Sequence, residues 1–94
     1  MDLTRETATE KAKEDLADRI SSDTGSISVE SVEDKDFPDM SLGAPVDGEM
    51  SAQMISSGWE IKLGAEGNIY EYRADKYQLR LFDWRGTNHL IDLE

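Results

Sequence analysis

Five acidic side chains gather near the middle of the chain, and they are the residues through which this sequence could do chemistry. Carboxylate oxygens are the ligands that Ca²⁺ prefers, and paired carboxylates can act as general acid and base. The spacing differs from a calcium loop of the EF-hand type, because Asp39 stands where the sixth position requires glycine and Lys35 would repel a cation. A calcium-binding acidic loop and a small hydrolase that uses Asp39 and Asp47 are therefore two alternative functions. The five acids are Asp34, Asp36, Asp39, Asp47 and Glu49.

Asp39 is also in a position to stabilise a turn. This residue follows Pro38, and an aspartate after a proline commonly accepts hydrogen bonds from the backbone two residues on, here near Ser41. We favour this interpretation over a role in metal binding or catalysis.

Other reaction signatures are missing from the sequence. The chain has no cysteine, which excludes disulfides and thiolate sites, and its single histidine, His89, has no recognisable catalytic or metal-binding partner. The glycines are spaced as turns and not as a phosphate-binding loop. We therefore predict no catalytic residue, no metal site and no cofactor. The glycines concerned are Gly43, Gly48, Gly58, Gly64 and Gly67.

Aromatic side chains are concentrated in the second half of the chain, close to arginines. One helix can cover only one face of a sheet, so a face that carries Phe82 and Trp84 would be exposed, and Tyr, Trp and Arg dominate binding energy at protein interfaces. The alternative is that the loop with Phe37, Met40 and Leu42 packs over this face as a second core layer. The sequence predicts a non-enzymatic protein-interaction module. Its candidate protein-binding residues are Phe37, Asp39, Leu42, Arg73, Arg80, Phe82 and Trp84.

Length and charge indicate the number of domains and the class of partner. The 94 residues predict one small domain spanning 1–94, and the net charge of −11 argues against nucleic acid and anionic membranes as partners, leaving another protein. Acidic residues are densest in the middle, where residues 21–58 carry eight acids and one base. The sequence shows neither a signal peptide nor a long apolar run, which predicts a cytoplasmic protein.

The elements that must position these residues are one helix and an antiparallel sheet. Apolar residues recur every four positions from Ala8 to Ile20, which predicts a helix over about 4–20 that is capped by Thr4 or Thr7. Alternating patterns then predict four to five strands within 26–84, followed by a polar C-terminal tail over 85–94. A helix on one face of an antiparallel meander gives an α+β fold. The predicted strands are 26–30, 50–55, 59–63, 69–73 and 77–84, the second being the weakest.

The run Phe37 to Gly48, together with Gly58-Trp59 and Tyr70-Glu71-Tyr72-Arg73-Ala74-Asp75, resembles a family of small uncharacterised bacterial proteins. These proteins carry an aromatic-Pro-Asp-x-Ser-Leu-Gly-Cys-Pro loop. The likeness covers about 11–82, with Ala44, Trp59 and Arg73 where the family has cysteine, tyrosine and often histidine. The chain is also faintly similar to PepSY-like domains. Both resemblances imply an α+β fold, and the first implies no established activity.

Overall fold

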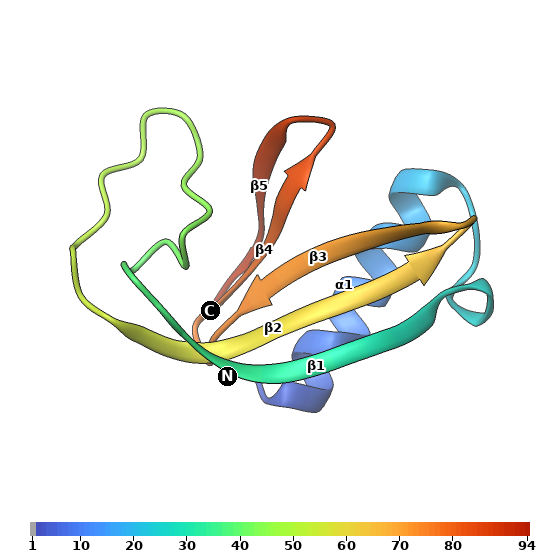
Figure 1. Cartoon of the computed structure of the whole chain (residues 1–94), viewed down its shortest axis with the longest axis horizontal. Helices are drawn as coiled ribbons and strands as arrows, with labels where there is room; N and C mark the ends of the chain where they lie inside the picture. Colours follow the sequence, from blue (N-terminus) through green and yellow to red (C-terminus); the bar gives the residue numbers. More distant parts are fainter. Residues whose placement is uncertain (1) are drawn as a thin grey trace.

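The computed structural model describes residues 2–94 and has the α+β architecture that the sequence predicts. One long helix lies behind a five-stranded antiparallel sheet whose strands follow one another in chain order (Figure 1). The strands β1 and β5 form the two edges. The elements are α1 (Arg5–Ile20), the short 3-10 helix η1 (Thr24–Ser26), β1 (Ser28–Phe37), β2 (Ser56–Ala65), β3 (Asn68–Ala74), β4 (Gln78–Trp84) and β5 (Thr87–Leu93).

The helix α1 begins and ends as its sequence dictates. Thr4 is the N-cap, and its side chain accepts a hydrogen bond from the backbone N–H of Thr7, whose hydroxyl accepts one from the Thr4 N–H in return. Ser21 ends the helix in the left-handed conformation. The buried face consists of Ala8, Ala12, Leu16 and Ala17, so small side chains bring α1 close to the sheet and its stability depends on that contact.

The main core lies between α1 and the sheet. Alternate residues of the central strands point towards the helix, among them Ile61, Leu63, Leu79 and Leu81, all fully buried. The ring of Tyr72 is also buried, and its hydroxyl donates a 2.7 Å hydrogen bond to Asp15 on α1. These contacts confirm the predicted amphipathic pattern of both layers.

The first predicted strands differ from the structure. The strand β1 is much longer than the predicted 26–30, because a bulge between Val29 and Ser31 interrupts the alternation and the strand continues to Phe37 through polar residues. Such residues fit an edge strand exposed to solvent. The predicted strand over 50–55 is wrong, since this segment pairs with no strand and belongs to the loop before β2.

The predicted C-terminal tail over 85–94 is also wrong. Arg85 and Gly86 both have positive φ and form a two-residue turn between Trp84 and Thr87, after which β5 pairs with β4. In addition, Lys11 on α1 contacts Asp92 on β5 at 2.9 Å. The sheet therefore extends to Leu93, and the helix is tied to its last strand.

Candidate functional site

A long loop contacts part of the sheet face that α1 leaves open, over β3 and β4. We call residues 38–55, between β1 and β2, the covering loop; it arches beside the β4–β5 hairpin, which turns steeply away from the other strands (Figure 1). Phe37, Leu42 and Ala44 are buried here. Of the two arrangements open at the sequence level, the structure agrees with the second for Phe37 and Leu42, whereas Met40 is 38% exposed.

Asp39 organises the beginning of the covering loop. Its Oδ1 accepts hydrogen bonds from the Ser41 N–H at 3.0 Å, the Ser41 hydroxyl at 2.7 Å and the Gly43 N–H at 3.0 Å. The Ser41 hydroxyl and the Gly43 amide lower the pKa of Asp39, which keeps the carboxylate ionised. The turn role predicted from the sequence is confirmed, and a lowered pKa is the opposite of what a general acid requires.

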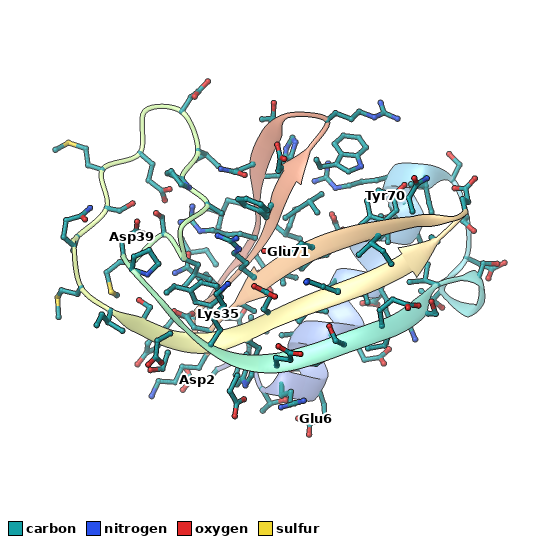
Figure 2. All side chains as sticks on the ribbon, viewed as in Figure 1. Asp2, Glu6, Lys35, Asp39, Tyr70 and Glu71 are labelled. Atoms are coloured by element: carbon teal, nitrogen blue, oxygen red, sulfur yellow. The ribbon has the colours of Figure 1, made fainter. Side chains whose placement is uncertain are left out.

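Arg73 on β3 fastens the middle of the covering loop. Its Nη1 donates to the carbonyl oxygens of Leu42 and Gly43 at 3.0 and 3.1 Å, and its Nε donates to Glu71 at 2.7 Å. The guanidinium also lies 3.8 Å from the ring centroid of Phe82. Figure 2 shows Glu71, with Lys35, on the sheet face opposite α1, and Asp39 to their left at the start of the covering loop. Arg73 therefore holds the loop through backbone carbonyls, independently of the loop's side chains.

Arg80 on β4 is the most enclosed charge in this region, with 3% of its surface exposed. Its guanidinium donates to both carboxylate oxygens of Glu49, at 2.6 and 2.5 Å, and to the Ala44 carbonyl at 3.1 Å. Its Nε donates to Gln78, which in turn donates to the Met40 carbonyl. The Arg80 hydrogen bond lowers the pKa of Glu49, so the pair stays charged beneath the loop.

The remaining acids of the loop region do not converge. Asp36 accepts a hydrogen bond from Ser57, and Asp34 contacts Arg5 at 3.4 Å. Within residues 2–94 no group of three or more His, Cys, Asp or Glu side chains is arranged to hold a metal ion. With Asp39 and Glu49 also engaged, the geometry gives no support to calcium binding or to catalysis by a carboxylate pair.

Phe82 and Trp84 lie on opposite sides of the sheet, although the alternating pattern put them on the same face. Asp83 has a φ of 51° and the pairing of β4 with β5 shifts register here, so Trp84 packs against the helix-side core. Arg19 and Arg85 lie 5.1 and 4.4 Å from its ring centroid. His89 packs edge-on against the same ring at 5.7 Å, which gives this histidine a packing role.

The seven predicted protein-binding residues thus differ in accessibility. Phe37, Leu42 and Arg80 are buried, and Asp39 and Arg73 hold the loop with their polar atoms. Phe82 and Trp84 both line a depression of about 460 Å³, which opens between β3 and the β4–β5 hairpin where the pairing of β3 with β4 ends at Phe82. Protein binding by this set stays a prediction.

A groove at the end of the sheet was missed at the sequence level. It has a volume of about 510 Å³ and lies between the last part of the covering loop, the start of β2 and the turn between β3 and β4. We call it the methionine groove. Its apolar lining is Met40, Met54, Ile55, Trp59 and Tyr77, and its polar lining is Ser56, Ser57, Asp75 and Lys76.

Comparison with known families places the chain in one of them. The family described as Domain of unknown function (DUF8738) matches residues 9–81, which is most of the chain. The chain belongs to the DUF8738 family. A search of curated proteins gave no match, and a search of solved structures gave none either.

The DUF8738 match can be placed on the structure. Residues 9–81 contain the whole covering loop, the arginines that hold it and every residue that lines the methionine groove, whereas Phe82, Trp84 and β5 lie outside. The family description names no activity, and it does not bear on the resemblance of the Phe37 to Gly48 loop. No helix within residues 2–94 combines the length and the apolar character needed to cross a membrane.

Proposed function

We propose that this DUF8738 protein is a non-enzymatic protein-interaction module that binds its partner through the methionine groove. The observation that carries the proposal is the clustering of exposed apolar side chains. Within residues 2–94, nine large apolar side chains are exposed, and four of them line this groove: Met40, Met54, Ile55 and Tyr77. Contiguous apolar surface of this kind marks interaction sites on soluble proteins.

The two walls of the groove support this proposal. Trp59 forms part of its lining and packs against the main core, while Met54 and Ile55 are 63% and 73% exposed on the loop. Methionine is flexible and polarisable, so it adapts to the shape of an apolar partner. Trp59 thus forms a fixed wall and Met54 a flexible one, which together suit a bulky apolar side chain of a partner.

A photo-crosslinking experiment tests the proposal. The photoreactive amino acid p-benzoylphenylalanine is placed at position 54 and, in a matched control, at position 18 on the exposed side of α1. In cells of the source organism we expect a discrete adduct from position 54 that is lost when Tyr77→Ser is added. Adducts that are equal at both positions would contradict the proposal.

A further inference from the structure

The methionine groove continues into a second, charged depression. Asp34, Lys35, Asp36, Ser57, Gly58 and Trp59 line this neighbouring hollow of about 320 Å³, which we call the acidic depression. Ser57 and Trp59 line both hollows. A bound segment that fills the groove therefore reaches the carboxylates of β1 without leaving the surface.

The carboxylates in the acidic depression can accept more hydrogen bonds. The side chain of Asp34 is 85% exposed and has only a 3.4 Å contact with Arg5, while Asp36 accepts one hydrogen bond, from Ser57 at 2.8 Å. An ionised carboxylate has about four acceptor positions, and Lys and Arg are its strongest partners. Both aspartates thus have unused acceptor positions for a basic side chain.

The neighbouring lysine does not neutralise these carboxylates. Lys35 lies between Asp34 and Asp36 in the sequence, but successive strand residues point to opposite faces, and its Nζ contacts Glu60 at 2.6 Å. The Lys35 hydrogen bond lowers the pKa of Glu60, as expected for a stable pair. With a net charge of −11 on the whole chain, the surface attracts cationic segments.

Charge also gives the groove a direction. At the rim formed by the turn between β3 and β4, the Nζ of Lys76 lies 5.3 Å from the ring centroid of Tyr77. The nearby Asp75 carboxylate is buried and accepts backbone N–H groups of Tyr77 and Gln78. The two ends of the groove thus differ, with the Lys76 ammonium at this rim and the exposed carboxylates of Asp34 and Asp36 at the other.

We propose that the methionine groove and the acidic depression together bind one short basic segment of a partner protein. A bulky apolar side chain of that segment enters the groove, and Lys or Arg side chains on one side of it contact Asp34 and Asp36. This inference rests on the proposed function and specifies that the segment of the partner is basic. A second copy of this acidic chain fits less well, because like charges would meet.

Selection from short peptides of random sequence tests the inference. The peptides are displayed on phage, selected on the immobilised protein and counter-selected on the Met54→Ser/Ile55→Ser variant, whose altered side chains are exposed. We expect a consensus with one bulky apolar residue and Lys or Arg on one side of it. A neutral or acidic consensus that still depends on the groove would overturn the inference and leave the proposed function intact. No groove-dependent enrichment would overturn both.

Charge variants then locate the contact. For the consensus peptide we expect Asp34→Asn/Asp36→Asn to weaken binding about fivefold at low salt, and the difference to disappear near 0.5 M salt. The matched control is Glu10→Gln/Asp18→Asn, which changes the net charge equally on exposed positions of α1. Equal weakening by both variants would show a long-range effect of net charge and would overturn the assigned contact.

Discussion

Gly58 on β2 is the residue at which the backbone leaves least room. A Cβ at this position would lie 2.0 Å from the carbonyl oxygen of Ala74 on the neighbouring strand, a distance no real contact reaches. Since the backbone fixes the position of a Cβ and the carbonyl is itself backbone, the clash cannot be relieved by rotating a side chain.

The substitution Gly58→Ala should therefore lower the free energy of unfolding by about 3 kcal/mol, since an overpacked strand must shift. Gly67→Ala is the matched control, because a Cβ there meets nothing within 4 Å and only its positive φ costs stability, about 1 kcal/mol. Urea denaturation of both variants measures the difference. Equal losses of unfolding free energy in the two variants would mean that the close approach of β2 and β3 does not add to the cost of Gly58→Ala.

Tyr72 links ionisation to folding at the residue scale. Burial of its ring, and then the hydrogen bond to Asp15, raise the pKa of the phenol above its ordinary value of 10.0. The folded protein thus holds this proton more tightly than the unfolded chain. The resulting stability is complete below the ordinary value and is lost as the pH rises above it.

Alkaline titration, followed by absorbance at 295 nm, tests whether the pKa of Tyr72 is raised in the folded protein. At about pH 11 the native protein should show phenolate absorbance from fewer than its three tyrosines, and denaturant should reveal the remainder. In Tyr72→Phe the native amplitude should be unchanged and the increase on unfolding should vanish. An unchanged increase in that variant would assign the protected phenol to another residue.

At the scale of elements, the covering loop is held by arginines more than by its own contacts. Arg80→Ala leaves Glu49, whose side chain is 23% exposed, without its partner, and losing charge-assisted hydrogen bonds of this kind costs about 1.5–3 kcal/mol. We expect faster hydrogen exchange over residues 38–49 and a lower urea midpoint. The control Arg85→Ala, at an exposed position away from the covering loop, should leave the exchange over residues 38–49 unchanged. If the paired change Arg80→Met/Glu49→Leu is as unstable as Arg80→Ala, the cost lies in packing and not in the unpaired charge.

Acid should release the same loop. The pKa values of Asp39 and Glu49 lie below their ordinary values of 3.8 and 4.5, because hydrogen bonds from Ser41 and Arg80 favour the ionised forms. Their contribution to stability is complete above those ordinary values and is lost as the pH falls through the lowered ones. Amide spectra recorded from pH 6 to about pH 3 should show the loop resonances collapsing before those of α1. Simultaneous loss of both would contradict a separately held loop.

The sequence predicts the elements wherever a simple period persists. The alternation of Trp59, Ile61 and Leu63 and the four-residue repeat in α1 specify β2 and the helix, because each has one buried face. The full extent of β1 and β5 could not be predicted in this way, because edge strands expose polar residues and bulges break their alternation. The methionine groove could not be predicted, because the fold must bring Met40 and Tyr77 together from distant parts of the chain.

At the scale of the whole molecule, the edge strand β1 is a place where the sheet of another molecule could pair. β1 is a ten-residue edge strand, and such strands readily pair with other chains. Here the edge carries four acids, and the Arg5 side chain at the start of α1 donates a hydrogen bond to the Val32 carbonyl and contacts Asp34. Charge and a capped carbonyl both oppose strand addition at this edge.

Removing these features should expose the edge to a second copy. In the variant Glu33→Thr/Asp34→Thr/Asp36→Thr, three β-branched residues replace charges along β1, so we expect concentration-dependent association in sedimentation velocity. The matched control Glu10→Gln/Glu14→Gln/Asp18→Asn makes the same change in net charge on α1 and should leave the sedimentation coefficient unchanged. Association of both variants would assign the effect to the loss of overall repulsion, whereas association of the β1 variant alone would show that the charges on this edge keep the sheet from extending.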